Sequence, residues 1–202
     1  DQPVVVNPVM NQPAMLSTYA ITKVPISSSA NIYTALVQST NCLHANQDLN
    51  AIIYTARGGG SYGMTGDDLK FLYSTDMGAN WDYIGLSDSV QKHRYPSGVI
   101  YNPQGNTDIM NAYVGFTGPS HQGTGWSHWY TGSLKLDSTN INVNYDLIKG
   151  GSFDQHFVRY GTDACDDGSL HAMGLDSANG HVSYISVNNG LFNLATNEVD
   201  WT

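Results

Sequence analysis

The sequence has little charge and almost none of the acidic residue that helices favour. Charged residues make up 12% of the 202 positions, and Glu198 is the single Glu beside sixteen Asp. Because Asp is common in turns and Glu in helices, and because long helical periodicity is missing, this balance predicts an all-β fold. Low charge together with 41% hydrophobic residues and 13 Tyr excludes a disordered chain.

Basic residues are also scarce. Eight Lys and Arg stand against 17 acidic side chains, which gives a formal charge of −9 and a pI near 4.9. A nucleic-acid-binding protein would carry a basic surface, so no nucleic-acid partner is expected. No apolar run approaches the roughly 20 residues of a membrane span, and no membrane insertion is expected either.

Cysteine is limited to Cys42 and Cys165, so at most one internal disulfide is available. The sequence does not place their Cα atoms, and both a bridge and two free thiols remain open. The first residues lack the basic and apolar regions of a signal peptide. Removal of such a peptide would leave this start, and the polar, Tyr-rich composition with five Lys favours export. The expected location is extracellular or at the outer cell surface.

What the chain does have is a series of strand signals separated by Gly, Asn and Asp clusters. They form three sets of four. The first set covers 32–38, 50–56, 69–74 and 81–86; the second covers 98–102, 111–117, 128–136 and 141–148; the third covers 156–160, 169–175, 181–187 and 191–195. Each set spans about 40 to 55 residues, the period of four-stranded propeller blades.

One turn carries a more specific pattern. The segment Ser74-Thr-Asp76-Met-Gly78-Ala-Asn-Trp81 lies between the third and fourth expected strands of the first set. It resembles the Asp-box of sialidase-like (bacterial neuraminidase repeat) β-propellers. The resemblance implies an Asp that accepts backbone N–H bonds, a Gly at positive φ and a Trp that packs between blades. The segment 186–192 resembles a degenerate copy.

The segments 46–57 and 94–103 resemble large secreted propeller proteins of Bacteroidota, which are exported by the type IX route. The expected organisation is an extended N-terminal segment (1–30), a partial β-propeller (31–198) and the start of a further element (199–202). The blades are expected at about 31–86, 97–148 and 156–195. Propellers close with about four to eight blades, so the remaining blades would come from the same protein or another chain. A β-sandwich is the alternative.

Strand order predicts where a ligand would bind. In an up-and-down blade, the loops between the second and third strands share a face with the blade-to-blade loops. Loops on a rigid scaffold commonly carry binding residues. The candidate ligand-binding residues on this loop face are Arg57, Asp67, Asp68, His93, Arg94, Tyr95, His121, Trp126, Asp154 and His156.

Sialidases hold the substrate carboxylate with three Arg and use a Tyr nucleophile activated by Glu, with an Asp acid. The chain has three Arg, but Arg159 lies in an expected strand, and Glu198 is close to the C-terminus. The family's catalytic Glu therefore has no counterpart, and no catalytic residue is assigned. The expected function is a non-catalytic module that binds a glycan or a cell-surface protein. The alternatives are a glycoside hydrolase with catalytic residues in missing blades and a structural component of a surface assembly.

Metal ligands are sparse. The seven His lack ligand spacing, and no metal is assigned. The segment 163–168 offers oxygens suited to calcium but lacks the full EF-hand spacing, so a simple turn without a cofactor is expected.

Overall fold

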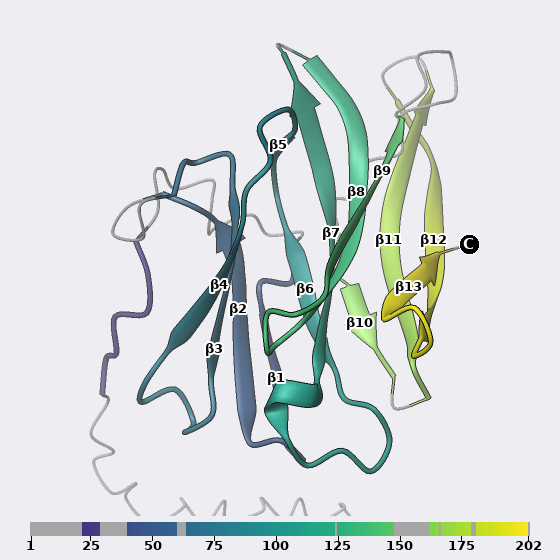
Figure 1. Ribbon diagram of the computed structural model, residues 1–202. Helices are drawn as coiled ribbons and strands as arrows, with labels where there is room; N and C mark the ends of the chain where they lie inside the picture. The colour runs from purple at the N-terminus through teal and green to yellow at the C-terminus, as the bar shows by residue number, and fades with distance from the viewer. Residues whose placement is uncertain are drawn as a thin grey trace, which may run out of the picture.

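The computed structural model describes residues 22–28, 40–59, 64–123, 125–147, 162–165, 167–178 and 181–201. These residues form three antiparallel sheets with one short 3-10 helix, η3 (Ile109–Asn111). Figure 1 shows the three sheets standing side by side, with their strands running between the same two ends of the molecule. The expectation of an all-β fold is confirmed.

The first sheet contains β1 (Leu43–Asn46), β2 (Ala51–Arg57), β3 (Leu69–Ser74) and β4 (Asp82–Leu86) in sequence order. The last three match the expected strands to within a residue. The expected first strand, 32–38, lies outside the described residues, and β1 occupies that position in the sheet.

The second sheet contains β6 (Ser97–Tyr101), β7 (Tyr113–Gln122), β8 (Gly125–Lys135) and β9 (Ile141–Leu147). A fifth strand, β5 (Lys92–His93), also pairs with β7. β5 pairs with the last residues of β7, and β6 pairs with its first residues. The two strands are halves of one interrupted edge strand. Tyr95, with φ of 45°, and Pro96 lie in the interruption and break the pairing.

The third sheet contains β10 (Thr162–Ala164), β11 (Ser169–Ala178), β12 (His181–Asn193) and β13 (Glu198–Trp201). The expected turn at 186–192 is wrong, because these residues continue β12 and 186–191 pair with β11. The chain reverses at Asn197 instead, where φ is 58° and the backbone N–H bonds the Asn193 carbonyl at 2.8 Å. Residues 198–201 then form the outer strand of this sheet, and the expected strand 156–160 lies outside the described residues.

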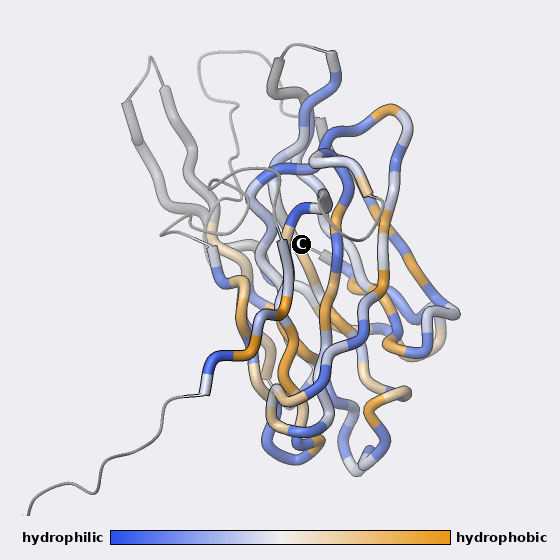
Figure 2. The backbone as a smooth tube through the Cα atoms, turned by 90° about the vertical axis from the view of Figure 1, so that its left-hand side faces the viewer, coloured by the Kyte–Doolittle hydropathy of each residue, from blue (hydrophilic) through white to orange (hydrophobic). Residues whose placement is uncertain are grey.

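Hydrophobic side chains pack in two layers, one on each side of the second sheet. One cluster joins Ile53 and Phe71 of the first sheet to Phe116 of the second. The other joins Val99 and Tyr113 of the second sheet to Leu170 of the third. Alternate residues of β6 and β7 face opposite layers, which explains why nearly every residue of these strands is buried. Figure 2 shows hydrophobic residues concentrated along the strands and hydrophilic ones at the turns.

The first strand of each sheet lies beside the first strand of the next. β6 contacts both β1 and β10. The Gly98 N–H of β6 donates to the Asn41 carbonyl just before β1 at 2.9 Å. The Asn41 amide in turn donates to the Thr162 carbonyl of β10 at 3.3 Å. Thr162 also shares a 2.9 Å hydroxyl contact with Thr117 of β7. The three sheets therefore meet along their first strands.

The turn between β3 and β4 is held by its own hydrogen bonds. The Asp76 carboxylate accepts bonds from the backbone N–H and the side-chain amide of Asn80 at 2.8 and 2.6 Å. The Ser74 hydroxyl donates to Asp76 at 2.8 Å and accepts from the Gly78 N–H at 2.8 Å. Gly78 has φ of 90°, and the Trp81 indole N–H donates to its carbonyl at 2.9 Å. The half-buried Trp81 ring thus closes on its own turn.

Both cysteines are free thiols, with Cys42 half-buried and Cys165 exposed. Among the described residues, no helix has the length and apolar character to cross a membrane. Most of the expected N-terminal segment, 1–30, lies outside the described residues.

Candidate functional site

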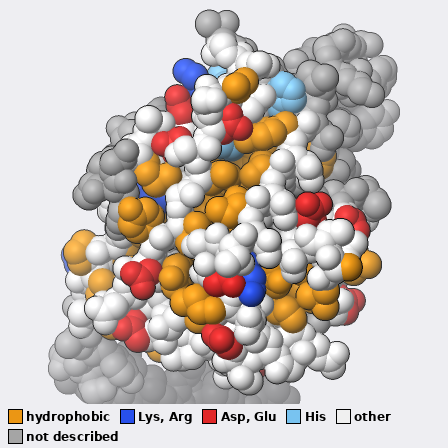
Figure 3. Space-filling model, viewed as in Figure 1, with side chains coloured by type: hydrophobic (Ala, Val, Ile, Leu, Met, Phe, Trp, Pro, Cys, Tyr) orange, Lys and Arg blue, Asp and Glu red, His pale blue; other side chains and the backbone are white. Residues whose placement is uncertain are grey.

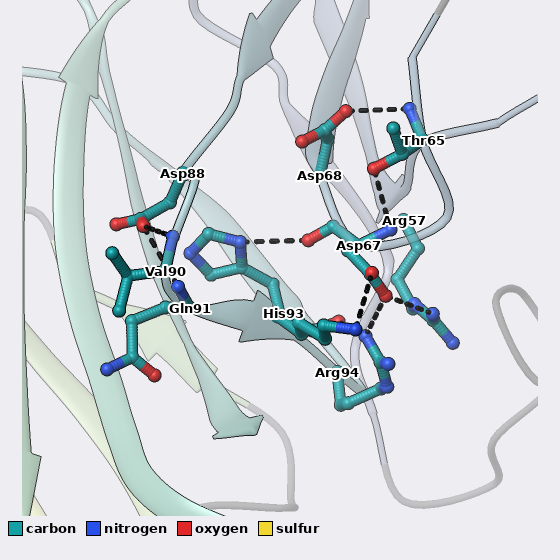
Figure 4. A network of polar contacts seen from close by, with 10 residues as sticks. Arg57, Thr65, Asp67, Asp68, Asp88, Val90, Gln91, His93 and Arg94 are labelled. Atoms are coloured by element: carbon teal, nitrogen blue, oxygen red, sulfur yellow. Dashed lines mark hydrogen bonds and ion pairs between the residues drawn. The ribbon is translucent and has the colours of Figure 1, made fainter. Parts of the chain in front are cut away.

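Three basic side chains converge on one carboxylate at the end of the molecule that carries β5 and the tip of the β7–β8 hairpin. Arg57 is the last residue of β2, Lys92 is in β5, and Arg94 lies in the break between β5 and β6. The Arg94 Nη1 contacts Asp67 Oδ1 at 2.7 Å, while Arg57 Nη2 and Lys92 Nζ each lie 3.6 Å from the Asp67 carboxylate. We call Arg57, Lys92 and Arg94 the basic cluster (Figure 4 shows Arg57 and Arg94 pointing to Asp67).

The basic cluster holds three of the eight basic residues of an acidic chain. Asp67 is the one carboxylate that pairs with it among the described residues. The site therefore carries a local excess of positive charge. On the face that Figure 3 presents, basic side chains are few and acidic ones are scattered.

Arg57 is the least satisfied member of the cluster. Its side chain is only 9% exposed, and its contact with Asp67 is too long for a hydrogen bond. Its Nε has no hydrogen-bond partner in the part of the chain that the structure describes. Burial and the neighbouring charge of Arg94 lower the pKa of Arg57, and Asp67 offsets this in part. A buried guanidinium with an unused donor is costly unless an anion completes it.

The loop between β2 and β3 fixes Asp67. The Asp68 carboxylate accepts the Thr65 N–H at 2.7 Å, and the Asp67 N–H donates to the Thr65 hydroxyl at 3.2 Å. The Asp68 carbonyl accepts the Gly58 N–H at 2.7 Å. Asp68 is buried and shapes the loop, whereas the one-third-exposed Asp67 reaches the basic cluster. Although burial raises the pKa of the Asp67 carboxyl, the bond from Arg94 and the charges of the basic cluster bring it below its usual value.

His93 lies directly beneath Asp67 and is fully buried. Its backbone N–H and ring Nδ1 lie 3.0 and 3.1 Å from the Asp67 carbonyl. Its Nε2 lies 2.8 Å from the Tyr145 hydroxyl, which donates to Asp88 at 3.0 Å. Burial lowers the pKa of His93, although the Asp67 carbonyl and the charge of Asp88 act against this. His93 thus supports the backbone that carries Asp67.

A second polar layer anchors this support. Asp88 accepts the backbone N–H bonds of Val90 and Gln91 at 2.7 and 2.9 Å (Figure 4). The Gln91 side chain accepts from the Ser120 hydroxyl at 3.0 Å and lies 3.3 Å from His128 Nδ1. The loop between β4 and β5 is therefore tied to both β7 and β8. The residues beneath the basic cluster are therefore held in place by hydrogen bonds before a ligand binds.

The structure brings part of the expected binding set together. Arg57 and Arg94 belong to the basic cluster, and Asp67 is the carboxylate that both of them contact. His121 pairs with Lys92 across β5 and β7, and burial and then the charges of Arg94 and Arg57 lower the pKa of His121. Tyr95 occupies the strand break.

Other expected residues take different places. His93 and Asp68 are buried supports. Trp126 pairs with His121 through the backbone of the β7–β8 hairpin, and its side chain lies outside the described part of the structure, as do Asp154 and His156.

Sequence reasoning missed Asp88 and Tyr145 and left Lys92 out of the binding set. Tyr145 belongs to a regular expected strand, and no local pattern shows that its hydroxyl reaches His93. The short strand β5 was expected to be loop, so nothing indicated that Lys92 and Arg94 flank a buried residue. The interrupted pairing along β7 is what directs both basic side chains to Asp67.

No cluster of three or more metal-ligating side chains occurs in the part of the chain that the structure describes. The segment 163–168, which offers oxygens but was expected to form a simple turn, leads from β10 to β11, and Asp167 accepts the Ser169 N–H and hydroxyl at 3.0 and 2.7 Å. Asp166 lies outside the described residues.

Comparison with family models, with curated proteins and with solved structures found no match for this chain.

Proposed function

We propose that this chain is a glycan-binding module of an exported or surface-bound protein, and that the basic cluster holds an acidic sugar. One observation carries the proposal. Arg57 is buried, its Nε has no partner among the described residues, and the Asp67 carboxylate stays 3.6 Å away. A planar guanidinium that lies beyond hydrogen-bond distance of its carboxylate neighbour is suited to a carboxylate ligand, which accepts two parallel hydrogen bonds.

The surroundings favour an anion at this place in an otherwise acidic protein. Lys92 and Arg94 share Asp67 with Arg57, so within the described residues three positive charges are paired with one carboxylate. An acidic sugar would be attracted to this site rather than to other parts of the surface, because the chain as a whole is negatively charged. The rigid base below the cluster keeps the ordering cost of binding small.

The β-propeller remains our proposal for the fold. Each of the three sheets runs outward in sequence order, and the first strands β1, β6 and β10 lie together. Sheets that meet along their first strands are typical of blades around an axis. A β-sandwich consists of two sheets packed face to face, whereas three sheets pack in succession here, with the second between the other two. Under this proposal the basic cluster stands on the loop face near the axis, and further blades would come from the same protein or another chain. An experimental structure of the natural protein, with its blades counted, tests this.

Titration calorimetry with 3′-sialyllactose, polygalacturonate and uncharged lactose tests the binding proposal. We expect the two acidic ligands to bind, lactose to bind far more weakly at this site, and added salt to weaken the acidic ligands. Arg57→Gln should weaken them by about tenfold or more, in line with loss of a charged hydrogen bond. Lys135→Gln is the matched control, because it removes one positive charge paired with Asp137 elsewhere.

Three outcomes contradict the proposal in distinguishable ways. Binding of polyglutamate but of neither acidic glycan would indicate a protein partner. Release of free sugar during the titration would indicate a glycoside hydrolase. No binding of any of these ligands would favour a structural component of a surface assembly.

A further inference from the structure

A hollow lies at the end of the molecule opposite the basic cluster. It has a volume of about 680 Å³. Its walls come from the same place in each sheet, the connection that follows the first strand: Asn46 and Asp48 from β1–β2, residues 102–107 from β6–β7, and Asp167 from β10–β11. We call this space the amide hollow, because Asn, Gln and Asp line most of it.

The amide hollow is built on fixed side chains. Asn102 and Asn106 bond each other through their side chains at 2.8 Å, and the Asn102 amide also reaches the Asn106 carbonyl at 3.1 Å. Asn46 accepts the Leu49 N–H at 3.1 Å. Asp167 is held by Ser169. The backbone of the three connections is therefore set before any ligand arrives.

Other side chains of the hollow are not used by the fold. Asp48, Gln104 and Thr107 are exposed, and within the described chain none of their side chains makes a hydrogen bond or ion pair. At Gly105, with φ of 78°, no heavy atom lies within 4 Å of where a Cβ would stand. The hollow thus offers free acceptors, free donors and open backbone on a fixed frame.

The charges of the hollow restrict its ligand. No Lys or Arg lines it, and Asp48 and Asp167 would repel an anion. The adjoining smaller hollow contains His44, whose Nδ1 accepts the Ile100 N–H at 3.2 Å. Burial lowers the pKa of His44, so this side chain adds no positive charge near neutral pH. No described group of metal ligands lies here.

We propose that the amide hollow binds an uncharged sugar through its hydroxyl groups. A hydroxyl both donates and accepts a hydrogen bond, and so it matches a wall that mixes amide donors with carboxylate and amide acceptors. The volume lies in the range of small-molecule sites. This site is separate from the basic cluster and does not depend on the function proposed for that cluster. A glycan that carries both neutral and acidic units could then be held at two ends of the molecule.

The experiment is titration of the full chain with the methyl glycosides of glucose, galactose, mannose and N-acetylglucosamine, followed by amide NMR. We expect at least one glycoside to bind in the millimolar range or better and to shift the side-chain amides of Asn102 and Asn106. The double variant Gln104→Ala, Thr107→Ala should raise Kd by about tenfold or more. Both residues are exposed and unbonded, so its thermal unfolding should match the wild type.

Two control variants test whether the loss of binding is specific to the amide hollow. Asn144→Ala removes an exposed amide from β9 and should leave Kd unchanged. Arg57→Gln should also leave it unchanged, so failure of the basic-cluster proposal would not affect this test.

The proposal is overturned if no methyl glycoside binds at concentrations up to about 20 mM. It is also overturned if glucosamine alone binds and Asp48→Asn abolishes that binding, because the hollow would then be an amine site. Glycoside binding that survives the double variant would place the sugar elsewhere and overturn it as well.

Discussion

Arg57 lies 3.6 Å from the Asp67 carboxylate while Arg94 bonds the same oxygen at 2.7 Å. Asp67 therefore satisfies Arg94 and leaves Arg57 buried with an unused donor. If the fold alone determined this arrangement, Arg57 would be expected to stabilise it. If a ligand completes the arrangement, Arg57 lowers the stability of the protein without ligand.

The first prediction follows from that difference. Arg57→Met keeps the length and apolar stem of the side chain but removes the charge, and Asp67 keeps Arg94 and Lys92 as partners. We expect the free energy of unfolding in urea to stay equal or to rise by up to about 1 kcal/mol, while binding of acidic glycans is lost. A loss of about 2 kcal/mol in stability would contradict this and would assign Arg57 a structural role.

The second prediction concerns Asp67. Asp67→Asn removes the one described carboxylate that pairs with the basic cluster, so the three positive charges repel one another. We expect a loss of about 1–3 kcal/mol in unfolding free energy at pH 7. The pKa of Asp67 is below its usual value, so its contribution is present above about pH 4 and disappears as pH falls further. The wild type and Asp67→Asn should therefore converge in stability as the pH falls below about 4, measured by urea unfolding at each pH.

In the same variant, acidic glycans should bind no more weakly than in the wild type, because the competing carboxylate is gone. A clear loss of binding would show that Asp67 positions the cluster for the ligand.

The third prediction tests the support beneath the site. Tyr145 has one hydroxyl proton and lies between His93 Nε2 and Asp88 Oδ2, at 2.8 and 3.0 Å. Tyr145→Phe leaves both partners without it, and we expect a loss of about 1–3 kcal/mol in urea unfolding. Tyr54→Phe is the control, because no hydrogen bond involves the Tyr54 hydroxyl in the described chain. Equal effects of the two variants would contradict a role for this hydroxyl.

The fourth prediction is a pH dependence from His93. Burial lowers the pKa of His93 in the folded state, against the opposing effects of the Asp67 carbonyl and the charges of Asp88 and Asp68. Since the unfolded state takes up a proton first, stability should fall as pH decreases below about 6.5, by at most about 1.4 kcal/mol per pH unit for this group. His44 and His121, whose pKa values are also lowered, add to the slope.

The matching measurement is urea unfolding between about pH 8 and pH 5 for the wild type and His93→Gln. The variant should be less stable at the alkaline end but lose less stability on acidification. If the stability of both proteins changed with pH in parallel, the pKa of His93 would be the same in the folded and unfolded states.

Much of the strand order follows from local sequence, because strands such as β2, β3 and β7 are rich in apolar and aromatic residues and are separated by Gly, Asn and Asp clusters. The end of the third sheet does not. Asn188-Asn-Gly190 has the composition of a turn, yet pairing with β11 keeps it extended, and the reversal occurs at Asn197. Long-range pairing outweighs local turn preference there.

For the candidate site, too, only a part can be predicted from the sequence. Loop topology predicts that Arg57, Asp67 and Arg94 lie at one end, because strand connectivity determines which loops share a face. It does not predict that His93 is buried, since β5 is only two residues long and leaves no alternation to detect. The bond from Tyr145 to Asp88 joins residues 57 positions apart and depends on how β9 packs.

The last prediction tests how the second and third sheets pack. A Cβ on Gly115 of β7 would collide with the Leu170 side chain of β11, so the absence of a side chain lets the two sheets approach. Gly115→Ala should therefore cost about 1–3 kcal/mol in urea unfolding by overpacking. Leu170→Ala should cost about 2–5 kcal/mol by leaving a cavity. Because each change relieves the other, the double variant should lose less than the sum, with a coupling of about 1–2 kcal/mol. Strict additivity would mean that these side chains do not meet and that the third sheet is not seated on the second as described.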